Sequence, residues 1–221
     1  MDQKPKKSGR TLFALGLGYL VDQGEAQSMG VLSPILLMVF SGLTNSLIGL
    51  METLRNIAQT VSAPFWGYMA DRYSRRKVLI FGTGVWGLWT VAVGLVPNFQ
   101  WMIWIRAISG LGLGCLMPAT FSLIADHFPQ RRRGMALGVI GLVGLMGTVL
   151  GVLALGFVAT PELWRWGFIG LGIVSILSGL VIWLFVDEPP RGASEPELAG
   201  LITHQNEKRY EINWKDMFST L

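Results

Sequence analysis

The sequence predicts an all-α membrane protein with six transmembrane helices and both termini in the cytoplasm. Apolar residues make up 51% of the 221-residue chain, charged residues only 14%, and the mean hydropathy is +0.47. Lys and Arg gather in short segments that separate long apolar runs. A water-soluble domain needs no such composition, and the 28 glycines suit helices that approach one another closely in lipid.

Six apolar runs follow one another along the chain, each near the roughly 20 residues that cross a bilayer as a helix. Turn signals such as Ser41-Gly42 and Val96-Pro97-Asn98 separate them. We expect helices over residues 11–38, 45–70, 77–96, 101–125, 135–158 and 165–186. In this interpretation residues 1–10 are a basic cytoplasmic segment, 11–187 the bundle, and 188–221 a cytoplasmic linker or tail with a short amphipathic end.

Positive charges indicate the orientation. Apart from Arg55, Arg106 and Arg165, the 18 Lys and Arg residues lie in four blocks. These blocks are Lys4–Arg10, Arg72–Lys77, Arg131–Arg133 and Arg191–Lys215. Because cytoplasmic loops carry an excess of Lys and Arg, we expect both termini on the cytoplasmic side of a cell's inner (plasma) membrane. The same confinement argues against a nucleic-acid partner, despite the net charge of +4.

Five ionisable residues fall inside the predicted spans: Asp22, Glu25, Glu52, Arg55 and Arg106. Such groups are costly in lipid, so they mark functional sites by default. A spacing of three residues puts Asp22 and Glu25 on one helix face, and Glu52 and Arg55 on one face of the next helix. With a rise of about 1.5 Å per residue, Glu25 lies level with Arg55, and Glu52 with Arg106. We expect these side chains to pair around a polar cavity.

Two interpretations of these charges stay open. Glu52 and Arg55 form either a structural pair that holds helices together or part of a site for substrate and proton coupling. For Asp22, Glu25 and Arg106 the cavity interpretation is favoured. Desolvation and a nearby Arg act in opposite directions on a carboxylate, and the hypothesis is that Asp22 or Glu25 loads and releases a proton near physiological pH.

Nothing in the sequence indicates an enzyme. His127 and His204 lie in expected cytoplasmic segments, and no metal-binding spacing of His and Glu occurs. The single cysteine, Cys115, lies in an apolar run without an intramembrane His to activate it. We therefore expect no catalytic residues, no metal and no cofactor.

Three motifs lie in or beside the predicted spans: Gly67–Arg76, Arg106–Gly114 and Asp126–Arg133. Together they resemble the amino-terminal six-helix half of a major facilitator superfamily transporter, over about residues 12–191. The first motif matches the family's loop between helices two and three, with Ser74 where Gly is usual. The second is similar to the family's Arg and glycine pattern in helix four, and the third to its acidic residue and Arg between helices four and five.

The resemblance implies a charge lock on the cytoplasmic side, formed by Asp71 and the following cations, that opens as two halves of the transporter rock. The residues assigned to this gating motif are Gly67, Asp71, Arg72, Arg75, Arg76, Asp126 and Arg133. The implied activity is secondary transport of a small organic solute by alternating access, with proton-coupled symport as one form of it.

The subfamily is indicated less specifically. The fifth predicted helix has no Pro, which departs from the Gly-Pro motif of drug/proton antiporters. Tyr19-Leu-Val-Asp22 is similar to the first helix of organic-anion symporters and Spinster-type lipid transporters, although Gln23 stands where that helix often has Arg. The forked donors of Arg55 and Arg106 favour an anionic or amphipathic solute.

A complete transporter of this type has two six-helix halves with the substrate site between them. The expected partners are therefore the lipid bilayer, a small-molecule substrate and a second six-helix half. That half is either another copy of this chain in a homodimer or a missing carboxy-terminal half. The alternatives are a non-transporting six-helix scaffold and a truncated fragment.

Overall fold

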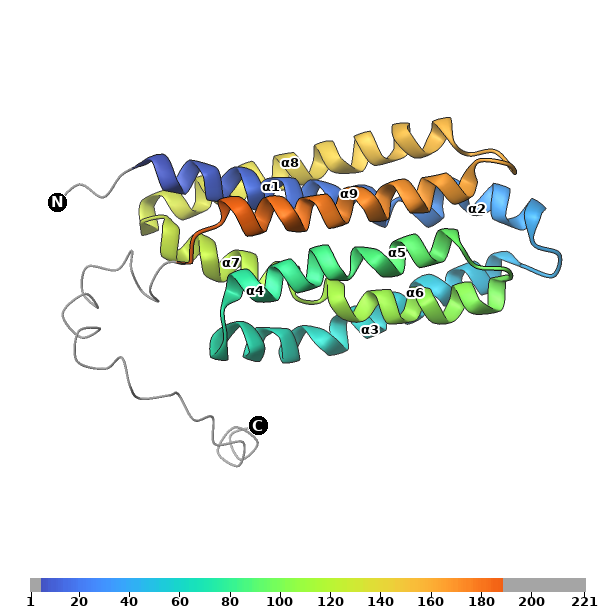
Figure 1. Cartoon of the computed structure of the whole chain (residues 1–221), viewed down its shortest axis with the longest axis horizontal. Helices are drawn as coiled ribbons and strands as arrows, with labels where there is room; N and C mark the ends of the chain where they lie inside the picture. Colours follow the sequence, from blue (N-terminus) through green and yellow to red (C-terminus); the bar gives the residue numbers. More distant parts are fainter. Residues whose placement is uncertain (1–4, 189–221) are drawn as a thin grey trace, which may run out of the picture.

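The computed structural model describes residues 5–188, which form an elongated bundle of helices lying side by side (Figure 1). The predictions for residues 189–221, including the expected amphipathic end, lie outside this range. The helices in chain order are α1 (Pro5–Ala26), α2 (Ser28–Val39), α3 (Asn45–Arg72), α4 (Arg75–Leu79), the π-helix η1 (Ile80–Val85), α5 (Gly87–Gly94), α6 (Phe99–Leu113), α7 (Leu116–His127), α8 (Gln130–Phe157) and α9 (Trp164–Phe185).

These helices make six long segments, but three of the six are interrupted, which the sequence did not predict. The segment expected at 11–38 is divided into α1 and α2 at Gln27. The third contains the π-helix η1, and the fourth breaks between α6 and α7 at Gly114 and Cys115. Breaks of this kind leave backbone groups to be satisfied by neighbours, so in membranes they occur inside a protein interior.

Several helices also begin or end outside the predicted boundaries. The first begins at Pro5 instead of residue 11, and α8 begins at Gln130 instead of residue 135. Hydropathy shows where apolar side chains end, whereas a helix continues as long as its backbone hydrogen bonds do. Helical turns that carry basic residues therefore precede the predicted spans.

Polar side chains cap three helices where the sequence turns. The Thr44 hydroxyl accepts from the Leu47 N–H at 3.3 Å, Ser74 from Lys77 at 3.2 Å, and Asn98 from Trp101 at 3.1 Å. Each cap satisfies an N–H group that the helix itself leaves without a partner. The caps therefore fix where α3, α4 and α6 begin.

Four segments within the described range are long and apolar enough to cross a membrane: Arg75–Gly94, Phe99–His127, Gln130–Phe157 and Trp164–Phe185. The all-helical membrane fold is thus supported, while the count of six spans stays a prediction. The segments that fall short are α1–α2 and α3, which carry the charges Asp22, Glu25, Glu52 and Arg55. These charged side chains, which are the ones proposed for function, lower the mean hydropathy of the two segments.

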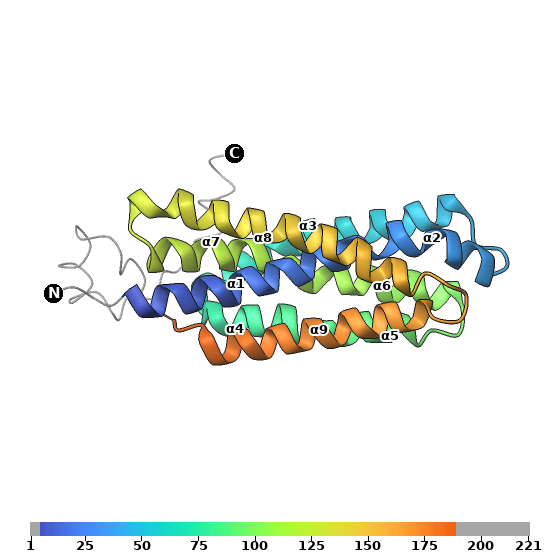
Figure 2. The same ribbon diagram turned by 90° about the horizontal axis from the view of Figure 1, so that it is seen from above.

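The bundle has two chemically different ends. The start of α1, the end of α9, the α3–α4 turn and the α7–α8 turn all lie at one end (Figures 1 and 2). We call it the cationic end, because it holds Arg72–Lys77 and Arg131–Arg133. The opposite end holds the loops at 40–44, 95–98 and 158–163, and Arg165 beside them.

Glycines let pairs of helical segments approach until their backbones are in contact. A Cβ on Gly151 of α8 would lie 2.5 Å from the Cα of Gly24 in α1, and one on Gly87 of α5 would lie 2.9 Å from the carbonyl oxygen of Gly172 in α9. Close approach of small residues supplies the packing that holds helices together in lipid.

Two apolar clusters fill the interior on either side of a polar layer. The cluster toward the cationic end includes Leu15, Leu79 and Leu123, and the other includes Leu36 and Phe168. The charged residues in the middle of the bundle lie between the two clusters: Asp22, Glu25, Glu52, Arg55 and Arg106. The fold therefore holds these charges near mid-length of the bundle.

Candidate functional site

Arg106 of α6 lies at the centre of the polar layer. Its side chain is fully buried, and its Nη2 contacts the Oε1 of Glu52 on α3. Its Nη1 donates to the Ser28 hydroxyl at the start of α2, at 3.3 Å. Arg106 therefore ties three helices together through one planar group, as an arginine fork permits.

Glu52 also forms an ion pair with a second arginine, on its own helix. The Nη1 of Arg55 lies 3.5 Å from the Oε2 of Glu52, one turn away. The Arg55 side chain is buried, whereas that of Glu52 is 27% exposed. Within the described residues, the Nε atoms of Arg55 and Arg106 have no hydrogen-bond partner. Both Nε atoms are buried, so each guanidinium keeps one N–H group that the described residues do not satisfy.

Glu25 of α1 points into the bundle. It is 3% exposed, and the hydroxyl of Thr90 on α5 donates to its Oε1 at 2.8 Å. A cavity of about 10 Å³ adjoins this carboxylate, lined also by Ser109 and Ser175. That volume is near the smallest that holds one water. Glu25 therefore faces a hydroxyl-lined interior instead of an open surface.

Asp22 lies on the same helix but in a different setting. It is half-buried, and in the described part of the chain its carboxylate accepts no hydrogen bond. Its charge acts on Glu25 and Arg55. We call these five residues, Asp22, Glu25, Glu52, Arg55 and Arg106, the central ionic cluster.

Sequence reasoning named all five charged members of this cluster and missed their hydroxyl partners. Ser28 follows Glu25 by three residues, and Ser109 follows Arg106 by three, so each lies on the face of a charge already identified. That spacing was the available signal for these two. Thr90 stands alone in an apolar run, and only the tertiary fold, in which its hydroxyl reaches the Glu25 carboxylate, identifies it as the partner of Glu25.

A second cluster lies at the cationic end and is built around Arg75. The Arg75 side chain is 3% exposed; its Nη1 contacts Asp126 of α7 and donates to the Ser122 hydroxyl at 2.9 Å. Its backbone N–H donates to Glu188 at 2.7 Å, and Ser74 also hydrogen-bonds to Glu188. We call Ser74, Arg75, Ser122, Asp126 and Glu188 the arginine lock.

The other motif residues take separate places around this lock. Arg76 donates to the carbonyl of Trp183, and Arg72 donates to the Tyr68 hydroxyl at 2.6 Å. Arg133 donates to the carbonyl of Phe128 at 3.2 Å. Asp71 is exposed, and a Cβ on Gly67 would meet open space. The structure therefore brings together Arg75 and Asp126 of the predicted gating residues, and leaves Asp71 and Gly67 on an open face of α3.

Replacing Arg75 with Gln should destabilise the bundle by about 1–2 kcal/mol, because charge-assisted hydrogen bonds to Asp126 and Ser122 are lost at a buried position. Arg72→Gln is the matched control in the same turn. Arg72 is exposed, so its loss should cost less than about 1 kcal/mol. Thermal unfolding in detergent measures both variants, and equal midpoints would contradict the assignment of the lock to Arg75.

Apolar helices that hold ionisable side chains at mid-length are typical of membrane transport proteins. The chain is a member of the major facilitator superfamily, whose family model matches residues 15–220. The predicted resemblance to this superfamily and to Spinster-type transporters is confirmed, and the family is one of transporters, not enzymes.

The chain is similar to Protein spinster of Drosophila melanogaster, with 31% identity over 152 residues that cover 68% of this chain and 25% of that protein. It is also similar to Multidrug resistance protein 3 of Bacillus subtilis (strain 168), with 34% identity over 113 residues, covering 51% of this chain and 22% of that protein. The fold is similar to that of a bacterial homolog of the human lysosomal transporter Spinster in an inward-facing and occupied conformation. The TM-score is 0.76 at 24% identity, covering 89% of this chain and 48% of that one. This chain therefore spans about a quarter of these curated relatives and about half of the solved structure.

Proposed function

We propose that this chain forms the amino-terminal half of a secondary transporter that moves a small organic solute by alternating access. The central ionic cluster borders the solute passage in this proposal, and the arginine lock closes the cationic end. The observation that carries it is the polar face of α3.

One side of α3 is polar through the middle of the bundle. Successive residues are rotated by about 100° around the axis of an α-helix. One side of α3 therefore presents, in order around the axis, Arg55, Glu52, Asn56, Thr60 and Thr53. The last three are exposed, whereas Arg55 is buried and Glu52 lies between these extremes. The hydroxyls of Thr53 and Thr60 donate to carbonyls of their own helix at 2.8 and 2.9 Å. The exposed amide of Asn56 and the partly exposed carboxylate of Glu52 are unfavourable against lipid at mid-membrane depth. This face therefore suits water or a second bundle, as the wall of a passage does.

The charge count of the central ionic cluster supports proton coupling. Three carboxylates and two guanidinium groups sum to −1 when all are ionised, so uptake of one proton makes the cluster neutral. Asp22 is the proposed entry point because it is half-buried, and Glu25, held by Thr90, is the second candidate.

Amide substitution at either carboxylate should remove the pH dependence of uptake. With Asp22→Asn or Glu25→Gln, we expect solute uptake into proteoliposomes at acidic and neutral external pH to become equal. Glu162→Gln is the control, because Glu162 is exposed in the loop at the opposite end. A pH profile identical to that of the unchanged protein in both variants would overturn the coupling proposal.

The proposed solute is anionic or amphipathic. Arg55 keeps an Nε without a partner among the described residues, and a guanidinium fork suits carboxylate or phosphate. A thermal-shift screen of organic acids, sugars and lysolipids tests this, because a ligand that binds the folded state raises the unfolding temperature. Stabilisation by sugars alone would contradict the anionic assignment.

The proposed partner is a second six-helix bundle. The chain would lie in the inner (plasma) membrane, with both of its termini on the cytoplasmic side. The location of cations at one end supports this orientation. Glycines at 138 and 141 of α8 and at 49 and 67 of α3 have open space beside them, which suits close approach of another bundle. Cross-linking in native membranes distinguishes a second copy of the chain from a separate carboxy-terminal half, and a purely monomeric product excludes the homodimer.

A non-transporting scaffold is the second candidate function, favoured by the deep burial of Arg106, Arg55 and Glu25. In a scaffold, Asp22 and Glu52 would also be closed off from water. Solvent access at these two positions therefore separates the two candidates.

A further inference from the structure

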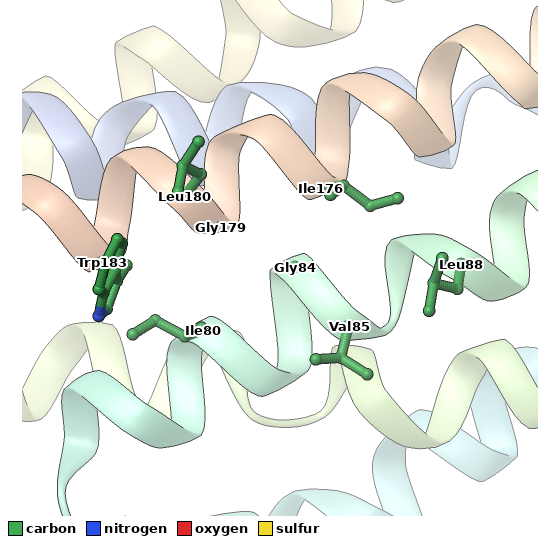
Figure 3. A pocket seen from close by; sticks show the side chains of 8 residues that line it. All are labelled: Ile80, Gly84, Val85, Leu88, Ile176, Gly179, Leu180 and Trp183. Atoms are coloured by element: carbon green, nitrogen blue, oxygen red, sulfur yellow. The ribbon is translucent and has the colours of Figure 1, made fainter.

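A groove runs along the outer surface of the bundle between η1–α5 and α9 (Figure 3). Its volume is about 470 Å³. Ile80, Val85 and Leu88 line one side, and Ile176, Leu180 and Trp183 line the other. Except for the indole N–H of Trp183, these side chains are hydrocarbon. The groove is therefore built for an apolar occupant.

Two glycines create the groove. A Cβ on Gly84 would lie 3.3 Å from the Cα of Gly179, so the two backbones meet without side chains between them. The larger residues one turn above and below stand away from this contact and form the walls (Figure 3). An α-helix would rise about 12 Å from Ile80 to Leu88, and the π-helix η1 makes this stretch somewhat shorter. The resulting space is long and narrow, like an extended hydrocarbon chain.

Cations lie at one mouth of the groove. Ile80 and Trp183 mark the mouth nearest the cationic end. Arg76 precedes Ile80 by one turn and donates to the carbonyl of Trp183, and Lys77, three residues before Ile80, is exposed. An apolar channel that ends at two cations complements an anionic headgroup joined to an acyl chain.

We propose that this groove binds an anionic phospholipid of the surrounding bilayer, with one acyl chain along Gly84 and Gly179 and the phosphate beside Arg76 and Lys77. A second copy of the chain fits less well. A two-fold axis along the membrane normal through this groove would bring Arg76 and Lys77 of both copies together at the same depth, where like charges repel. The proposal does not depend on transport activity.

Photolabelling of the 221-residue chain in lipid nanodiscs tests the site. The probes are phosphatidylglycerol and phosphatidylcholine, each with a diazirine on one acyl chain, and labelled peptides are mapped by mass spectrometry. We expect phosphatidylglycerol to label residues 80–88 and 176–183 at least about fivefold more than phosphatidylcholine. Lys77→Gln should lower this preference by about fivefold, the effect of one cation near an anionic lipid.

Two further variants separate groove binding from general lipid contact. Leu88→Trp places a large side chain in the groove and should reduce labelling by both probes. Leu177→Trp is the control, since Leu177 is exposed on α9 and does not line the groove. If Leu88→Trp does not fold, Lys77→Gln still decides, because its side chain is exposed. Equal labelling by both headgroups, labelling unaffected by Leu88→Trp in a folded variant, or cross-links from the groove to a second copy would each overturn the proposal.

Discussion

Replacing Arg106 with Met should destabilise the bundle by about 3 kcal/mol and abolish the proposed transport. The variant leaves Glu52 without its closest partner and Ser28 without a donor. Removing one member of a buried ion pair costs about 3–5 kcal/mol. The lower value is expected because the Glu52 side chain is 27% exposed and keeps Arg55 nearby. Thermal unfolding in detergent gives the stability change.

A double-mutant cycle shows whether the cost comes from this pair. Glu52→Gln in the Arg106→Met background removes the carboxylate that is left unpaired, so the double variant should be more stable than the sum of the two single losses. Arg10→Met is the control, because Arg10 is exposed near the start of α1. Strict additivity of the Arg106 and Glu52 changes would contradict the pairing.

Replacing Gly110 with Val should destabilise the bundle by about 3 kcal/mol and separate α3 from α6. A Cβ on Gly110 would collide with the carbonyl oxygen of Arg55 and lie 3.0 Å from its carbonyl carbon. Backbone atoms cannot move aside as a flexible side chain can, so the cost lies at the upper end for overpacking. The shift would also move Arg55 and Glu52 away from Arg106.

Gly141→Val is the matched control for this prediction. Gly141 is helical like Gly110, but a Cβ there meets open space. In the isolated chain its replacement should change stability by less than about 0.5 kcal/mol, because Val has a slightly higher helix propensity than Gly. Similar losses in both variants would show that glycine itself, and not the contact with Arg55, sets the effect.

The sequence was informative about the segments and the charges because both leave strong one-dimensional signals. Six apolar runs separated by turn residues gave six helical segments. The cost of charge in lipid then identified Glu52 and Arg106, which the structure pairs across α3 and α6. The positions of Arg75 and Asp126 came from the family motif, and the structure joins them.

The helix interruptions could not be predicted from the sequence, because they depend on tertiary contacts. In η1 the Ser175 hydroxyl on α9 donates to the carbonyl of Thr83 at 2.8 Å. A partner on another helix thus satisfies a backbone group of the π-helix. No local pattern in residues 80–85 reveals this partner.

The direction in which the Glu25 side chain points could not be predicted from the sequence either. Its spacing from Asp22 placed both carboxylates on one face, but residues three apart still differ by about 60° around a helix. The tertiary fold buries Glu25, which accepts from the Thr90 hydroxyl, and leaves Asp22 half-buried. Access to a passage is therefore expected at Asp22 and Glu52, whereas Arg106 and Glu25 support the cluster from inside.

Thiol labelling of single cysteines tests the passage most directly. With Cys115 replaced by Ala, Asp22→Cys and Glu52→Cys are each exposed to a charged, membrane-impermeant maleimide in proteoliposomes, and Leu177→Cys serves as the lipid-facing control. We expect positions 22 and 52 to react with the maleimide and position 177 to stay unlabelled. Protection of both positions 22 and 52, in folded protein and from either side of the membrane, would contradict a water-filled passage beside the central ionic cluster.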